Sequence, residues 1–116
     1  MTYVTGSVCA VEAGRKDEFT RFSKDFAKLA AEFGATRCID CWGEDVPHGR
    51  QTDFYRAVDA KEGEVVVFSW MEFPSKQVAD TAMQQMMDDP RMAALGQMPF
   101  DGKRMIYGGF SPVSGE

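Results

Sequence analysis

Apolar residues recur along this chain at two different spacings, and the spacing predicts where helices and strands lie. Between residues 15 and 33 phenylalanine and leucine recur at steps of three and four, which predicts an amphipathic helix that Gly34 ends. A second helix is predicted over 75–88, and a short helical turn over 90–95. Runs rich in β-branched and aromatic residues predict strands at 3–11, 36–42, 65–73 and 103–110, with a shorter extended piece at 54–58.

The order of these elements is β-α-β-β-α-β, the ferredoxin-like arrangement of an antiparallel sheet with two helices on one face. We therefore expect an α+β fold. The length of 116 residues predicts a single domain over 1–116, with a frayed tail at about 111–116.

The third predicted strand carries large apolar side chains on both of its faces. One face has Val66, Phe68 and Trp70, and the other has Val65, Val67, Met71 and Phe73. Two helices cover only one face of a sheet, and each large apolar side chain gains about 1.5–3 kcal/mol from burial. We therefore expect a homodimer, a dimeric α/β barrel in which two sheets pack face to face. The alternative is a monomer in which the loop at 43–53 covers the second face.

Charge and cysteine content narrow the classes of function. The formal net charge is −5 and the basic residues are scattered, so binding to nucleic acid is disfavoured. No secretory signal and no membrane-spanning segment is apparent, so we expect a cytoplasmic protein without a membrane partner. Cys38 and Cys41 form a C-x-x-C, but residues three apart on a strand face opposite sides, so we expect no metal site and no redox pair.

The segment Met98–Phe110 reads MPFDGKRMIYGGF and raises the question of a phosphate-binding loop. Such a loop needs glycines between a strand and the start of a helix, and here a proline-containing tail follows instead. Asp101 and Gly102 predict a turn, and Gly108 and Gly109 predict a bulge or the close approach of another backbone within a bent strand.

The chain resembles the YbaA-like family of uncharacterised bacterial proteins, which is placed in the dimeric α/β barrel superfamily. The resemblance rests on GEDVPHG at 43–49, VVFSW at 66–70, DPRM at 89–92 and the segment 98–110. It implies a ferredoxin-like protomer that pairs across its sheet. It implies no reaction, although relatives in the wider superfamily include cofactor-free monooxygenases of aromatic polyketides.

Several residues are candidates for chemistry, each with a structural alternative. His48 lies in a polar loop near Asp45 and Asp53 and is a candidate general base or ligand contact, or a solvated loop histidine. Phe68 and Trp70 are candidates to line an aromatic-ligand pocket, although aromatic residues at strand spacing usually pack in a core. The other candidates, which form either a carboxylate or phenolate site or structural ion pairs, are Arg56, Asp101, Lys103, Arg104 and Tyr107.

Three hypotheses of function follow. The first is a homodimer with a small-ligand pocket between sheet and helices, in the manner of a cofactor-independent oxygenase or isomerase. The second is a non-catalytic dimer that binds a regulatory or stress-related partner. The third, RNA binding, has the least support, and no motif for a nucleotide, haem or flavin cofactor is present.

Overall fold

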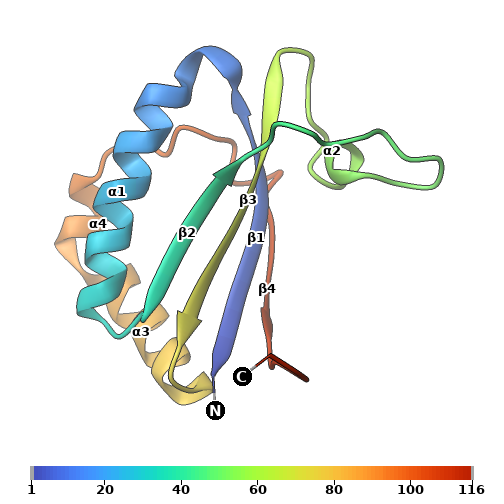
Figure 1. Cartoon of the computed structure of the whole chain (residues 1–116). Helices are drawn as coiled ribbons and strands as arrows, with labels where there is room; N and C mark the ends of the chain where they lie inside the picture. Colours follow the sequence, from blue (N-terminus) through green and yellow to red (C-terminus); the bar gives the residue numbers. More distant parts are fainter. Residues whose placement is uncertain (1, 116) are drawn as a thin grey trace.

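The computed structural model describes residues 2–115 and shows an antiparallel sheet with a layer of helices on one side (Figure 1). The elements in chain order are β1 (Tyr3–Glu12), a 3-10 turn (Ala13–Arg15), α1 (Lys16–Glu32), β2 (Arg37–Trp42), α2 (Phe54–Ala57), β3 (Glu64–Phe73), α3 (Lys76–Asp88), α4 (Pro90–Ala94) and β4 (Ile106–Phe110). The strand order is β2-β3-β1-β4, so the ferredoxin-like α+β arrangement predicted from the sequence is confirmed.

The two central strands determine the register of the whole sheet. β1 and β3 pair along their full length, from Tyr3 opposite Phe73 to Glu12 opposite Glu64. β2 adds to the free side of β3, and β4 adds to the free side of β1 over five residues. Directly opposite side chains project to the same face, so these pairings assign every strand residue to one of two faces.

The helix-facing side of the sheet holds three of the four apolar clusters. One cluster combines Cys9, Val11 and Val67 with Phe19 of α1. Two further clusters, around Leu29 and around Phe73, join the sheet to α1 and α3. The predicted split of β3 into two apolar faces is therefore confirmed, with Val67 toward the helices.

Three local predictions have clear outcomes. Gly34 has φ +118°, which confirms the left-handed end of the first helix. The extended piece predicted at 54–58 is wrong, because α2 forms there and the Asp53 side chain accepts a hydrogen bond from the Arg56 N–H at its start. The last strand begins at Ile106 rather than at 103, because Asp101 and Arg104 form a turn before it.

Residues 43–60, which we call the arm, connect β2 to β3 and project from the sheet away from the helix layer (Figure 1). The arm includes α2 and returns to the sheet at Val58, which is fully buried. Within residues 2–115 no helix combines the length and apolarity that crossing a bilayer requires. The tail predicted to fray includes Glu116, which lies outside the described residues.

Candidate functional site

The face of the sheet opposite the helices, which we call the outer face, is covered by its own chain at one end only. There Val8, Ala10 and Val66 are buried beneath Val58 of the arm, with Val46, Tyr55 and Ala60 packed against them. The alternative expected from the sequence, that the 43–53 loop covers this face, therefore holds for this end, although residues beyond 53 supply most of the cover. Within residues 2–115 no segment of the chain covers the rest of the outer face.

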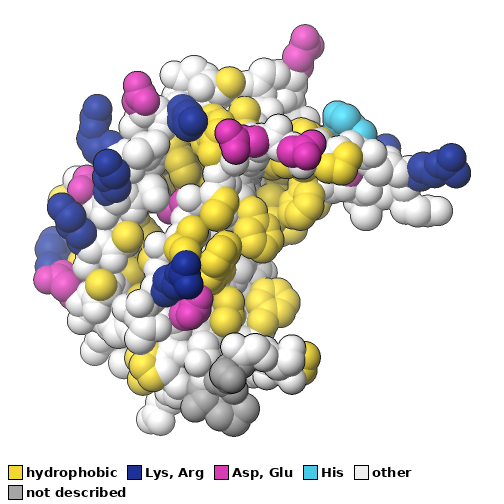
Figure 2. All heavy atoms as spheres, in the orientation of Figure 1, with side chains coloured by type: hydrophobic (Ala, Val, Ile, Leu, Met, Phe, Trp, Pro, Cys, Tyr) yellow, Lys and Arg dark blue, Asp and Glu magenta, His cyan; other side chains and the backbone are white. Residues whose placement is uncertain are grey.

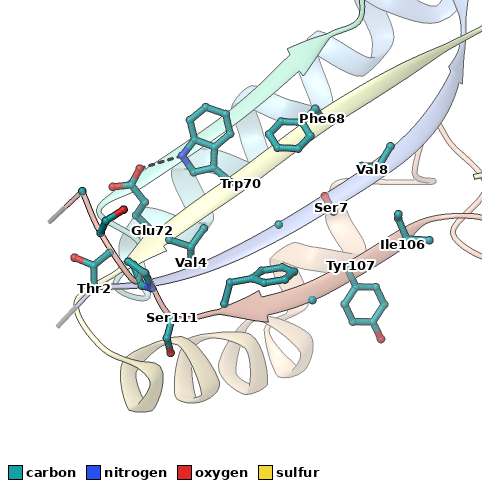
Figure 3. A pocket seen from close by; sticks show the side chains of 16 residues that line it. Thr2, Val4, Ser7, Val8, Phe68, Trp70, Glu72, Ile106, Tyr107 and Ser111 are labelled. Atoms are coloured by element: carbon teal, nitrogen blue, oxygen red, sulfur yellow. Dashed lines mark hydrogen bonds between the residues drawn. The ribbon is translucent and has the colours of Figure 1, made fainter. Parts of the chain in front are cut away.

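The uncovered part of the outer face forms an open hollow of about 850 Å³ (Figures 2 and 3). Phe68 is 48% exposed, Ile106 45% and Phe110 59%, which are high values for large apolar side chains on a sheet. Trp70 lies beside them and its Nε1–H donates a 3.0 Å hydrogen bond to Glu72. The structure thus places Phe68 and Trp70 together on the outer face, not between sheet and helices as the first hypothesis expects.

The charge of the hollow is set by a single residue. The lining consists of Thr2, Val4, Gly6, Ser7, Val8, Phe68, Trp70, Glu72, Ile106, Tyr107, Gly108, Phe110, Ser111, Pro112, Ser114 and Gly115. Glu72 is the one ionisable side chain there apart from the phenol of Tyr107, and no lysine or arginine of the described residues belongs to the lining. A carboxylate ligand would therefore meet a like charge in this hollow.

The glycine pair in β4 makes room for aromatic rings instead of a bulge. The register of β4 against β1 is continuous from Ile106 to Phe110, so the predicted bulge is wrong. A Cβ on Gly108 would lie 3.1 Å from the Phe110 ring, and one on Gly109 would lie 2.0 Å from the Tyr3 Oη. Each glycine thus lets a neighbouring aromatic ring lie flat against the strand, on opposite faces of the sheet.

His48 and Arg56 meet around one carboxylate at the arm. The Asp53 side chain is only 3% exposed and lies 3.6 Å from His48 Nδ1 and 3.9 Å from an Arg56 nitrogen. The backbone N–H groups of Arg56 and Gly49 donate to Asp53 and hold its pKa below the ordinary value. The His48 ring stacks on Tyr55 at a centroid distance of 4.3 Å, and the His48 side chain remains 77% exposed.

Arg104 is occupied by structural partners. It pairs with both carboxylate oxygens of Glu64 at 2.8 Å, with Asp101 at 3.1 Å, and with the Asp59 carbonyl at 2.8 Å. The pair with Arg104 lowers the pKa of Glu64 to about 2. Asp101 also accepts the Lys103 N–H, so the structural alternative for these residues is the one that the geometry favours. Tyr107 lies apart from them and is exposed.

The cysteines are not arranged for metal or redox chemistry. Cys38 lies opposite Met71 on the helix-facing side, whereas Cys41 lies opposite Phe68 on the outer face. Burial, with a smaller contribution from Asp40, raises the pKa of Cys38 to about 11 and that of Cys9 to about 12. Among residues 2–115 no three histidine, cysteine or acidic side chains converge as metal ligands.

Two contacts in the structure were not predicted from the sequence. The Glu64–Arg104 pair joins residues 40 apart in the chain, and no local pattern signals such a contact. The packing of Tyr55, whose hydroxyl donates to the Val46 carbonyl at 2.7 Å, was also missed. Asp53 three residues before Arg56 is a recognisable N-cap pattern that does signal the start of α2.

Comparisons with known proteins agree with this fold. A family model described as "Protein of unknown function (DUF1428)" matches residues 2–102. The "Uncharacterized protein YbaA" of Escherichia coli (strain K12) is 56% identical over 117 aligned residues, which cover 100% of both chains.

Three solved structures are similar in fold at low sequence identity. An uncharacterized NIPSNAP domain protein from Burkholderia xenovorans gives a TM-score of 0.61 at 15% identity, over 97% of this chain and 95% of the other. SnoaB, a cofactor-independent oxygenase from Streptomyces nogalater, gives a TM-score of 0.52 at 16% identity, over 98% of this chain and 95% of the other. A dimeric ferredoxin-like protein from an uncultured marine organism gives a TM-score of 0.52 at 8% identity, over 95% of this chain and 92% of the other.

Proposed function

Since the chain belongs to the family described as "Protein of unknown function (DUF1428)", which carries no assigned activity, we propose a function from the geometry of its sheet. Two copies pack their outer faces together, and the hollow on each face encloses a small neutral aromatic ligand beside Phe68 and Trp70. The observation that carries this proposal is the uncovered apolar surface of β1, β3 and β4.

A second copy of the chain fits the outer face better than water does. Burying a large apolar side chain is worth about 1.5–3 kcal/mol, and several such side chains are half exposed here. The surface is nearly free of charge, so a self-complementary twofold contact meets little like-charge repulsion. A similar fold occurs in a solved structure whose description names a dimeric ferredoxin-like protein.

The ligand is expected to be aromatic and neutral rather than anionic. Aromatic rings pack favourably against Trp70 and Phe68 in offset or edge-to-face geometry. The carboxylate alternative needs a free guanidinium, and the two candidates, Arg104 and Arg56, bind Glu64 and the Arg50 carbonyl instead. The hollow contains no histidine, so we propose binding as the function that this geometry supports best.

Ligand binding can be tested by nuclear magnetic resonance of the two indole N–H groups. The chain has two tryptophans, so Trp70→Phe and Trp42→Phe variants assign both signals. Toluene serves as a neutral aromatic probe and benzoate as its charged counterpart. We expect toluene to shift the Trp70 signal and benzoate to leave it unchanged. A Trp70 signal that stays in place at every toluene concentration would refute an aromatic site in the hollow.

A further inference from the structure

The arm is braced by its own hydrogen bonds, although it projects from the sheet (Figure 1). The buried carboxylate of Asp53 accepts the Gly49 N–H at 3.1 Å and the Arg56 N–H at 2.8 Å. The Arg56 guanidinium donates to the Arg50 carbonyl at 3.2 Å. A Cβ on Gly49 would lie 2.2 Å from the Thr52 carbonyl oxygen, so only glycine permits this close turn. The arm therefore has a fixed shape of its own.

The tip of the arm, which we define as residues 46–52, carries positive charge. Its sequence VPHGRQT contains Arg50 and no acidic residue. Arg50 is exposed, and within residues 2–115 its guanidinium forms no hydrogen bond and no ion pair. Figure 2 shows the histidine and a basic side chain on the projecting arm. The tip thus presents an unpaired cation on the side of the sheet where a second copy packs.

A negative charge lies at the opposite end of the outer face. β3 starts close to the arm at Glu64 and ends at Phe73, so Glu72 is at its far end, within the lining of the hollow. Trp70 donates to the Glu72 carboxylate at 3.0 Å. Arg37 is opposite Glu72 in the register, yet among residues 2–115 no ion pair joins the two. The carboxylate therefore has acceptor capacity left for a cation from outside the protomer.

The positions of these charges favour one of two ways in which the outer faces can pack. A twofold axis along the strands brings the two arms to the same end, with each Arg50 and each Glu72 near its own copy. An axis across the strands reverses β3 over the partner's β3, so each arm meets the Glu72 end of the other protomer. The second arrangement pairs opposite charges twice, and it places a projection over a hollow.

We infer that the arm of each protomer closes the partner's hollow and that Arg50 pairs with Glu72 of the partner subunit, an inference that rests on the dimer proposed above. The aromatic-ligand site then belongs to both chains. One chain supplies Phe68 and Trp70, and the arm of the other supplies the cover. Phe54 of the arm is 44% exposed and available for this contact. Because the arm is already ordered, docking costs little conformational entropy.

Charge reversal in a mixed dimer tests the pairing. Arg50→Glu and Glu72→Arg each create like-charge contacts, so each variant alone should raise the dissociation constant of the dimer by at least about tenfold. In a dimer that contains one chain of each variant, both arm–hollow contacts again join opposite charges. We therefore expect an equimolar mixture to recover the wild-type dissociation constant in sedimentation. Native mass spectrometry should find mainly the mixed dimer.

The helix layer offers matched controls for the change in net charge. Lys24 and Asp25 of α1 are exposed, and both lie on the opposite side of the protomer from the outer face. Lys24→Glu and Asp25→Arg should therefore leave the dissociation constant unchanged and form no preferred mixed dimer. The Trp70 indole signal gives a second readout. Toluene should bind Arg50→Glu at least about tenfold more weakly than the wild type, because the hollow stays open.

The outcomes separate this inference from the dimer itself. A wild-type dimer whose dissociation constant is unchanged in Arg50→Glu and Glu72→Arg would overturn the arm contact and leave the dimer intact. Two weakened variants that do not recover on mixing would also overturn the pairing. A toluene affinity that is unchanged in Arg50→Glu, although the dimer is weakened, would show that the hollow binds without the arm. A single-chain mass for the wild type would overturn the dimer and the arm contact together.

Discussion

On its helix side the sheet is covered by α1, α3 and α4, whereas on its outer side it is covered only where the arm folds back. The two faces also differ in where their polar groups lie. The outer hollow is almost entirely apolar, with Glu72 beside Trp70, and the helix-facing side has polar groups at its centre. In an ordinary two-layer protein the uncovered face of the sheet is the polar one, so the outer face departs from that pattern because it is both uncovered and apolar.

The missing cover assigns a role to the outer face. An apolar face without its own cover favours association with another surface, because burial of that surface contributes free energy. We therefore assign association and aromatic binding to the outer face.

The largest effect is expected at the ion pair between Arg104 and Glu64. Arg104 and Glu64 are 16% and 9% exposed and join the turn before β4 to the start of β3. Glu64→Gln should lower the free energy of unfolding at pH 7 by about 2–3 kcal/mol, because the shielded Arg104 guanidinium loses its bidentate carboxylate and keeps only Asp101 and the Asp59 carbonyl. Urea unfolding measures this change, and Glu62→Gln, at an exposed neighbouring position, should be near neutral.

The same pair predicts a pH dependence of defined sign. The pKa of Glu64 is about 2 in the folded protein and ordinary in the unfolded chain, so its stabilising contribution is complete above pH 4.5. It is lost as the pH falls from 4.5 toward 2. The Glu64→Gln variant should show a flatter loss of stability across this window, and a slope equal to that of the wild type would contradict the assignment.

The next effect separates the covered and uncovered ends of the outer face. Val58 of the arm is fully buried against β1 and β3, so Val58→Ala should cost about 1–3 kcal/mol of protomer stability whatever the protein concentration. Ile106 is half exposed, so Ile106→Ala should weaken only the concentration-dependent part of the stability. Urea unfolding at two protein concentrations tests both variants. Equal and concentration-independent losses would remove the distinction between the two ends.

A smaller effect compares the two glycines of β4. Gly109→Ala brings a Cβ to 2.0 Å from the Tyr3 Oη, so the Tyr3 ring must move, at a cost of about 1–2 kcal/mol. Gly108→Ala meets the exposed Phe110 ring, which can shift at little cost to the protomer. Thermal unfolding of both variants should therefore rank Gly109→Ala as the more damaging. The reverse ranking would show that Phe110 is fixed in place.

The smallest effect concerns the arm. Asp53 begins α2 and its carboxylate is buried, so Asp53→Ala should cost about 1 kcal/mol. His48 is mostly exposed, so His48→Ala should change protomer stability by less than about 0.5 kcal/mol. Thermal unfolding measures both. A loss for His48→Ala as large as that for Asp53→Ala would show that the ring stacked on Tyr55 contributes to holding the arm.

Periodicity predicted the elements and the two faces because both depend on local spacing. The phenylalanine stripe of α1 and the alternation along β3 follow directly from the 3.6- and 2-residue repeats. The segment at 54–58 was predicted as extended because its apolar residues suit a strand, but the Asp53 cap favours a helical turn there. The bulge at Gly108 and Gly109 was wrong because aromatic rings use the space that the glycines leave.

The site could be predicted only in part. Phe68 and Trp70 were identified from their strand, but which face stays open depends on where the arm folds back, which no local pattern specifies. Arg104 was a ligand candidate until its distant partner Glu64 was known.

The central claim is that a second copy of the chain covers the outer face, and sedimentation equilibrium of the full chain at micromolar concentration tests it most directly. The account predicts a species of twice the 12.9 kDa chain mass, which dissociates when Phe68→Asp introduces charge into the hollow. Met87→Asp, which makes the same kind of change at an exposed residue of α3, should leave the mass unchanged. A single-chain mass for the wild-type protein at these concentrations would contradict the claim.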